Sequence, residues 1–320
     1  MTDTSPKTPP GASHKESRQA TKEFPDGRRN RIGRHLQTSG GLGKTVERAR
    51  DLGCEAIQIF VSNPQGWALP AERSDSELQA FSAGVRDTGL YPVVAHAKYL
   101  INLASKDPEQ RERSIQTLAD ELSLAGRVGA DLVVVHSGSH GGAGEEEGMK
   151  LLAEGLVKAR ERAGNGADGA DGARPAEPVL ENSVGAGTQL CCSLDTLGAA
   201  ARQAGVRVCV DTAHAFVAGY DLSTPEAADG VGREMAETLG ERVALFHLND
   251  AKNALGSHRD GHMRIGEGMI PAPSWEALFA RMPEVPVAME TPYGTPEMDA
   301  EQVRLVKELA GGLPLSTPNV

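Results

Sequence analysis

Short apolar runs recur eight times along the chain, and each is followed by a segment with helical spacing of its apolar residues. Most runs are rich in β-branched residues and continuous in apolarity, as is typical of strands buried on both faces. They predict strands at residues 31–35, 56–61, 91–96, 131–136, 178–182, 206–211, 243–248 and 285–290. The gaps predict amphipathic helices, among them 45–52, 77–87, 110–128, 147–162 and 193–204.

This alternation of strand and helix predicts an α/β fold, a (β/α)8 TIM barrel. The chain has 320 residues, enough for one such barrel, which commonly needs about 250. A doubly wound open sheet is the alternative architecture. It would not bring all the strand ends around one pocket.

The composition of three segments sets them apart from the barrel. Residues 1–29 are rich in Pro, Ser, Thr, Lys and Gly and predict a disordered N-terminal tail. Residues 163–177 (AGNGADGADGARPAE) predict an exposed insertion between barrel units, and residues 311–320 a loose C-terminal tail. The catalytic barrel domain is therefore expected at residues 30–310.

Composition favours a soluble cytoplasmic protein, and we expect a monomer. No stretch approaches the ~20 consecutive apolar residues of a membrane-spanning helix, and the N-terminus lacks the apolar core of a signal peptide. The four cysteines form no CxxC pair, which is typical of reduced thiols. The net charge of −11 argues against a wholly basic surface but does not exclude a local nucleic-acid site, since bound divalent metals would add positive charge there.

Six of the eight apolar runs end on a residue that can bind a metal. These residues are His96, His136, Glu181, Asp211, His247 and Glu290. In a parallel barrel the C-terminal ends of all strands open onto one face, so side chains far apart in sequence converge there. Converging histidines and carboxylates indicate a metal site.

Three more donors stand close to these strand ends. His214 follows Asp211 by three positions, and Asp260 and His262 lie in the loop after the seventh predicted strand. Nine donors are too many for one tetrahedral zinc, which takes three or four, so two or three metals are implied. Clustered divalent ions bridged by a carboxylate suit phosphodiester hydrolysis.

Four segments of the chain carry a specific family resemblance. They are VVVHSGSH (133–140), LENSVGAG (180–187), VDTAHAFVAGYDL (210–222) and FHLNDAKNALGSHRDGHMRIGEG (246–268). With them, residues 31–309 resemble the endonuclease IV family, zinc-dependent apurinic/apyrimidinic endonucleases of the xylose-isomerase-like barrels. The resemblance implies a DNA-repair enzyme that hydrolyses the phosphodiester 5′ to an abasic site in double-stranded DNA, leaving a 3′-hydroxyl and a 5′-deoxyribose phosphate.

The resemblance also implies three zinc ions and assigns their ligands. The three ligand sets are His96, His136 and the bridging Glu181; then Glu181, Asp211, His247 and Glu290; and finally His214, Asp260 and His262. All nine positions match the family pattern. Glu181 and Glu290 are the expected catalytic residues.

DNA contacts are expected at Gln65, Trp67, Tyr99 and Leu100. Trp67, Tyr99 and Leu100 each follow a strand end, where loops reach the active face, so either DNA contact or local packing explains them. The chain departs from the family beside these residues. Gln65 stands where the family usually carries an arginine, two residues before Trp67. Ala97 and Lys98 stand where the family usually has Asp-Ser after its first histidine. The first change removes a charge at the DNA, and the second removes polar groups that could orient His96.

Two other functions fit parts of the pattern. A metal-dependent sugar isomerase or epimerase shares the barrel type and its histidine and carboxylate ligands, but generally has fewer histidines than this chain. A non-catalytic metal-binding protein would need a broken ligand set, and none of the nine donors is missing. His35, at the end of the first predicted strand, either lines the pocket or closes the barrel base.

Overall fold

The structure is a computed structural model that describes residues 30–165 and 173–311. The predicted N-terminal tail (1–29), all of the predicted C-terminal tail (311–320) except Gly311, and the centre of the predicted insertion, residues 166–172, lie outside the described residues. Those predictions about domain limits remain predictions.

Eight parallel strands close into a barrel, in the order β1-β10-β7-β6-β5-β4-β3-β2. The strands are β1 (Ile32–His35), β2 (Ala56–Ile59), β3 (Val93–His96), β4 (Leu132–His136), β5 (Glu177–Glu181), β6 (Arg207–Asp211), β7 (Val243–His247) and β10 (Val287–Met289). All eight coincide with the predicted runs, so the TIM-barrel prediction is confirmed and the open sheet is excluded.

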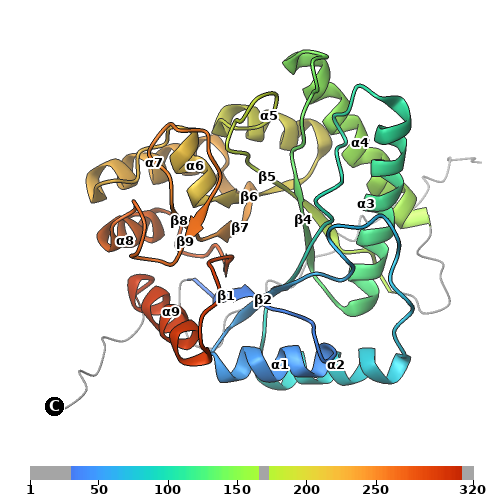
Figure 1. Cartoon of the computed structure of the whole chain (residues 1–320), viewed down its shortest axis with the longest axis horizontal. Coiled ribbons are helices and arrows are strands. Elements are labelled where there is room, and N and C mark those ends of the chain that lie inside the picture. The colour runs from blue at the N-terminus through green and yellow to red at the C-terminus, as the bar shows by residue number, and fades with distance from the viewer. Residues whose placement is uncertain (1–29, 166–172, 312–320) are drawn as a thin grey trace, which may run out of the picture.

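Helices surround the strands, as Figure 1 shows. They are α1 (Leu42–Asp51), α2 (Asp75–Thr88), α3 (Pro108–Val128), α4 (Glu145–Asn165), α5 (Leu194–Ala204), α6 (Thr212–Ala218), α7 (Pro225–Thr238), α8 (Ala272–Arg281) and α9 (Pro296–Leu309), with a 3-10 turn at Gly240–Arg242. Several begin two or three residues before their predicted start, because the first turn after a capping residue is polar and carries no apolar signal. Asp107, for example, caps α3 by accepting from the backbone of Glu109 and Gln110.

Both ends of the predicted insertion, residues 163–177, overlap elements of the structure. Helix α4 continues to Asn165, and β5 begins at Glu177. The last three residues of α4 are Ala163, Gly164 and Asn165. Glycine and asparagine are poor helix formers, so composition alone placed the helix end too early.

The loop after β7 contains an unpredicted hairpin. Strands β8 (Asp250–Ala251) and β9 (His262–Met263) pair antiparallel, with Ala251 opposite His262. The pairing fixes His262 near the C-terminal end of β7 in spite of the long loop between them. Strands of two residues are too short to show as a periodic pattern in sequence.

The barrel interior explains why the strand ends point into one pocket. A compact apolar cluster is formed by Val94, Leu132, Val134, Val179, Cys209, Ala244, Leu245 and Ala288. Six of these residues stand two positions before the strand-end donors, and side chains two apart on a strand share a face. The donors therefore form the layer that continues this interior packing at the C-terminal end of the barrel.

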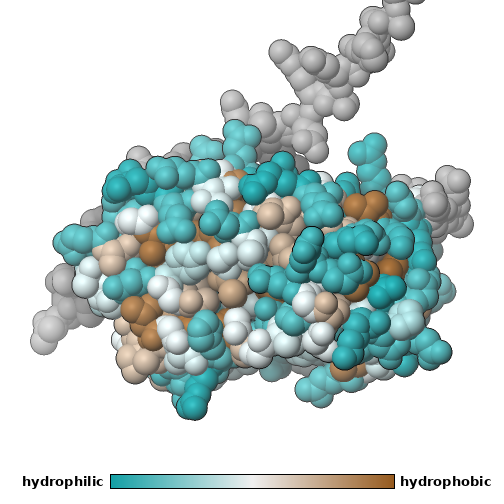
Figure 2. Space-filling model, turned by 90° about the horizontal axis from the view of Figure 1, so that it is seen from above, coloured by the Kyte–Doolittle hydropathy of each residue, from teal (hydrophilic) through white to brown (hydrophobic). Residues whose placement is uncertain are grey.

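Apolar side chains appear singly or in small groups on the largely hydrophilic face shown in Figure 2. Among the described helices, none is long and apolar enough to cross a membrane.

Candidate metal centre

The nine predicted donors come together at the C-terminal end of the barrel. Three groups have donor atoms that all lie within 4.8 Å of one another: His96 with His136 and Glu181; Glu181 with Asp211, His247 and Glu290; and Asp211 with His214 and His262. Glu181 belongs to the first two groups and Asp211 to the last two. The groups therefore form one connected cluster.

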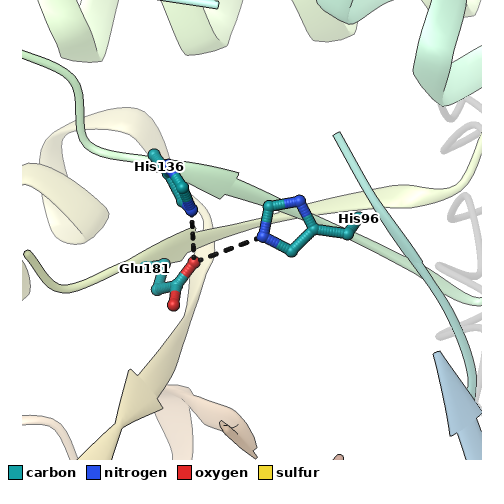
Figure 3. Close-up of side chains that lie close together, drawn as sticks. All are labelled: His96, His136 and Glu181. Carbon is teal, nitrogen blue, oxygen red and sulfur yellow. Dashed lines mark ion pairs between the residues drawn. The ribbon is translucent and has the colours of Figure 1, made fainter. Parts of the chain in front are cut away.

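The first group joins the ends of β3, β4 and β5. Figure 3 shows the rings of His96 and His136 directing a nitrogen at the same carboxylate oxygen of Glu181. The Nε2 atoms lie 3.6 Å and 3.3 Å from Glu181 Oε2. His96 and Glu181 are buried, whereas the His136 side chain is 42% exposed and reaches the cavity.

The second group lies deeper, between β5, β6, β7 and β10. His247 Nδ1 is 2.9 Å from Glu181 Oε1 and 3.3 Å from Glu290 Oε2. The Glu181 side chain is 1% exposed and that of Glu290 is 17% exposed. Glu290 is thus the carboxylate of this group that opens to the cavity.

The third group is the one whose composition differs from the expected set. The expected donors His214 and His262 are joined by Asp211, and Asp260 lies beside them with Oδ1 at 3.4 Å from His214 Nε2 and 3.6 Å from His262 Nε2. Helix α6 starts directly after β6, which carries His214 over the end of that strand. Asp211 also caps this helix, accepting from the backbone N–H of His214 at 2.9 Å.

Hydrogen bonds hold the opposite nitrogen of four of the rings, the longest being that of His262 Nδ1 to the backbone oxygen of Glu290 at 3.4 Å. The Nδ1 atoms of His96 and His214 lie 2.8 Å and 3.0 Å from the backbone oxygens of Ala97 and Asn182, which can only accept. The Nε2 of His247 lies 2.8 Å from Gln58 Oε1. Each of these nitrogens must carry the proton in the neutral ring, which leaves the other nitrogen bare and facing the cluster.

Two buried atoms of the cluster have no hydrogen-bond partner. They are Glu181 Oε2 and His262 Nε2. Buried polar atoms are rarely left without a partner, because each one costs about 1–3 kcal/mol. Bare imidazole nitrogens and carboxylate oxygens that converge in this way fit divalent cations with nitrogen and oxygen ligands.

Opposite charges shift the pKa values of the cluster in opposite directions. Burial alone would raise the pKa of Glu181, but the surrounding histidines, first His247 and His136, hold it well below its usual range. Burial would also lower the pKa of His214, but the carboxylates of Asp211 and Asp260 outweigh it and raise the pKa to about 10. The acidic groups therefore stabilise positive charge in this pocket, whether it is carried by protons or by metal ions.

His136 behaves differently from its neighbours. Although its side chain reaches the cavity, the surrounding protein removes water from the ring, and this desolvation lowers the pKa of His136 to about 4. A neutral imidazole is the form that binds metals, so this ring is ready to coordinate at neutral pH.

Three amide side chains orient the donors and were missed in the sequence. Gln58 donates to Glu290 Oε1 at 2.7 Å, Asn249 donates to Asp211 Oδ2 at 2.7 Å, and Asn182 accepts from the backbone of Asp211 at 2.7 Å. Gln58 gave a signal, because it is a polar residue inside an otherwise apolar strand. Asn182 and Asn249 stand one and two positions after a donor.

The cluster opens into a cavity of about 650 Å³. His35 lines it, with its Nδ1 3.8 Å from Glu290 Oε1 and 3.0 Å from Gln58 Nε2, which settles the question of its position in favour of the pocket. A neighbouring cavity of about 350 Å³ shares four lining residues with the first: Tyr99, His136, His214 and Asp260.

The predicted DNA contacts are divided between the cavities and an outer loop. Tyr99, which is 51% exposed, lines both cavities, and Leu100 lines the smaller one. Gln65 and Trp67 stand in the loop between β2 and α2, outside these linings, and the Arg113 guanidinium lies 4.2 Å from the centre of the Trp67 ring.

A buried lysine ties this loop to the end of β3. Lys98 donates to the backbone oxygens of Asn63 and Ala68 at 3.0 Å and 3.1 Å, and its Nζ lies 3.7 Å from Glu121 Oε1. Ser62 donates to the same carboxylate oxygen at 2.6 Å. Both residues at this departure from the family therefore have a role. The backbone oxygen of Ala97 orients His96, and Lys98 holds the loop.

Comparisons with known proteins agree with this geometry. Residues 46–309 match the family described as xylose isomerase-like TIM barrel. The probable endonuclease 4 of Oleidesulfovibrio alaskensis is 42% identical over 289 residues, covering 87% of this chain and 95% of that protein. The probable endonuclease 4 of Chloroflexus aggregans is 37% identical, covering 82% and 92%.

Solved structures extend the comparison. Endonuclease IV from Thermus thermophilus superposes with a TM-score of 0.76 at 34% identity, covering 88% of this chain and 99% of its own. A 3-keto-D-glucoside 4-epimerase from E. coli superposes with a TM-score of 0.62 at 15% identity, covering 87% and 99%. The epimerase shares the barrel fold, and at this identity the likeness extends no further.

Proposed function

The chain belongs to the endonuclease 4 family of xylose isomerase-like TIM barrels, and from that premise we propose that it repairs DNA by hydrolysing the phosphodiester 5′ to abasic sites. The products would be a 3′-hydroxyl and a 5′-deoxyribose phosphate. The observation that carries the proposal is the connected cluster in which Glu181 and Asp211 are each shared by two donor groups.

The cluster fits three zinc ions held by the nine donors named above. Bound zinc would supply Lewis acidity to polarise the scissile phosphate and favour attack by water. The shared carboxylates support closely spaced ions because one side chain can offer an oxygen to each of two groups. The two buried atoms without a partner, Glu181 Oε2 and His262 Nε2, support it because a cation in each of their donor groups would satisfy them.

The protein side chains divide the remaining work. Glu290 is open to the cavity and is held by Gln58, so it can contact the reacting phosphate or water in a fixed orientation. Glu181 is buried and would act by bridging ions. Tyr99 and Leu100 stand at the cavity walls, where they would contact DNA beside the lesion.

All nine donors come from one chain, so the site needs no second subunit. We therefore propose that the protein acts as a monomer. We also propose that it acts in the cytoplasm. Light scattering coupled to size-exclusion chromatography tests the oligomeric state.

A sugar isomerase or epimerase is the weaker alternative. The epimerases among the similar structures share the fold at less than 20% identity. Such enzymes generally hold one or two ions, and the group of Asp211, His214 and His262 would provide a site for a third. The similarity to endonuclease 4 proteins supports double-stranded DNA, and not a small sugar, as the substrate that we propose.

The decisive experiment uses a duplex oligonucleotide with one tetrahydrofuran abasic analogue. The expected result is a single nick on the 5′ side of the analogue, loss of nicking with chelator and its return with Zn²⁺. An identical duplex without the analogue is the control. Equal cleavage of both duplexes would contradict abasic specificity, and no cleavage by metal-replete protein would contradict the nuclease itself.

A further inference from the structure

Tyr293, in the segment between β10 and α9, is an aromatic residue that the proposed function has not used. Its side chain is 48% exposed and it lines the cavity that holds the donor cluster. We propose that Tyr293 is a DNA contact, a flat surface on which a nucleotide next to the abasic site stacks. This inference rests on the proposed function and adds a contact to it.

The ring of Tyr293 is held at two places. Its hydroxyl donates a hydrogen bond to the backbone oxygen of His35 at 2.9 Å. The Arg34 guanidinium carbon lies 4.8 Å from the ring centre, a cation–π contact. A ring held in this way loses little further freedom when a ligand binds, so the contact is pre-organised.

Arg34 is fixed in turn by buried partners. Its Nη1 lies 2.8 Å from Asp299 Oδ1, and its Nη2 donates to the backbone oxygen of Thr291 at 3.2 Å. Arg34 is 1% exposed, so it can cover only a part of the ring that is turned away from solvent. The exposed part of Tyr293 therefore stays open on the cavity side.

A second arginine holds the backbone beside the ring. Arg264 donates from Nε to the backbone oxygen of Pro292 at 3.3 Å. It packs so closely on Gly294 that a Cβ there would overlap its Nη2. The backbone N–H of Gly294 donates to Asp299 at 3.0 Å, so the segment is held from both sides.

Charges of both signs stand around the ring. Asp299 Oδ1 is 2.8 Å from Arg34 and 3.9 Å from Arg264, so two guanidinium groups share one carboxylate, while Glu290 lines the same cavity as Tyr293. Cations bound at the donor cluster would add the positive charge that attracts a phosphate. An open ring in the wall of such a cavity suits a nucleotide, which offers a base to stack and a phosphate to attract.

Stacking also suits the specificity that abasic repair needs. Every base has a flat π face, so a stacked base is held with little regard to sequence. Abasic sites arise in any sequence context, and a contact that read one base would exclude most of them. Tyr293 would hold the flanking nucleotide while the donor cluster takes the reacting phosphate.

Three variants test the inference: Tyr293→Ala, Tyr293→Leu, which keeps apolar bulk, and Tyr293→Phe, which keeps the ring. Single-turnover nicking of the abasic duplex at rising enzyme concentration gives an apparent Kd and a rate at saturation. The Ala and Leu variants should raise the apparent Kd roughly tenfold, and the Phe variant by less than about threefold, with similar saturating rates in all.

A second readout follows stacking directly. Duplexes with 2-aminopurine on the 5′ or the 3′ side of the abasic analogue are mixed with each protein in a stopped-flow fluorimeter. The fluorescence change before nicking should be present with the parent and Tyr293→Phe and absent with the Ala and Leu variants. The probe position that responds identifies the flanking nucleotide.

Three outcomes would overturn the inference. The Ala and Leu variants could bind as tightly as a parent that nicks normally, which leaves the proposed function standing. Tyr293→Phe could weaken binding as much as Ala, which assigns the effect to the hydroxyl. The fluorescence change could survive the loss of the ring. Thermal unfolding checks each variant, and if Ala does not fold, the Leu and Phe pair decides. A parent without nicking activity would instead contradict the proposed function.

Discussion

The donor cluster and the rim of its cavity are built in different ways. Seven of the nine donors stand at the ends of barrel strands or within three residues of them, above an apolar interior that fixes their direction. Asp260 and His262 reach the cluster through the β8–β9 hairpin. By the rim we mean Tyr293, which lines the cavity, and the loop of Gln65 and Trp67, which lies outside the cavity linings. These residues stand on connecting segments, which are held by buried charges and backbone oxygens. The strand ends provide the metal chemistry, and the loops decide what reaches it.

The difference predicts two kinds of mutational effect. A change in the cluster should reduce turnover of bound DNA, because it alters the chemistry itself. A change on the rim should reduce or increase affinity and leave turnover nearly unchanged. Each prediction below separates these two effects.

The largest expected effect belongs to Glu290→Gln. The substitution keeps size but removes the charge of the carboxylate that opens to the cavity, so kcat should fall by roughly 10²–10⁴-fold while affinity for abasic duplex changes much less. Steady-state kinetics and binding isotherms measure the two quantities. Glu297→Gln, the same change at the exposed start of α9, is the matched control. Parental turnover in Glu290→Gln would remove Glu290 from the catalytic account.

Lys98→Met tests how the rim is held. It leaves the Glu121 carboxylate buried without its cation, so the free energy of unfolding should fall by about 3–5 kcal/mol. The double variant Lys98→Met/Glu121→Gln removes both charges and should recover most of that stability. Urea denaturation measures both.

The same pair separates folding from recognition. Lys98 donates to two backbone oxygens of the loop that carries Gln65 and Trp67, and the double variant does not restore these bonds. Its affinity for abasic duplex should therefore stay several-fold lower than that of the parent, with kcat similar. Full recovery of affinity in the double variant would show that Lys98 contributes only stability.

Gln65→Arg carries the smallest expected effect. The added charge should tighten binding to abasic duplex a few-fold and steepen its salt dependence by roughly one counterion, while turnover of bound substrate changes little. Gln203→Arg is the matched control, because it adds the same charge at an exposed position of α5. Gln203 stands near the start of β6, at the opposite end of the barrel from the metal centre. Binding isotherms at several salt concentrations compare the two. Equal slopes in both variants would mean that the loop does not meet DNA.

The convergence of the donors could be predicted from the sequence because most of them end or follow regular barrel strands. Continuous apolar runs mark barrel strands, and the residue at the end of each run necessarily faces the pocket when the residue two before it faces the interior. His96, Glu181 and His247 follow this rule. Asp211 joins the third group because α6 places His214, and the β8–β9 hairpin places His262, beside it. The periodicity of the sequence does not reveal these positions.

The contacts that hold the rim could not be predicted, because they link segments that are distant in sequence. Lys98 looked like a substitution in a polar position, yet its amine is buried against a loop more than thirty residues away. Tyr293 lies after a strand like many surface tyrosines, and only its contacts with Arg34 and His35 distinguish it. Such contacts follow from tertiary packing and leave no local pattern.

The central claim is that one chain assembles several metal sites that share carboxylates. The most direct measurement is the zinc content per chain of metal-replete protein, by inductively coupled plasma mass spectrometry, for the parent, Glu181→Ala and His262→Ala. The account predicts about three zinc ions in the parent, loss of two together in Glu181→Ala and of one in His262→Ala. A parent that holds one zinc or fewer would contradict it.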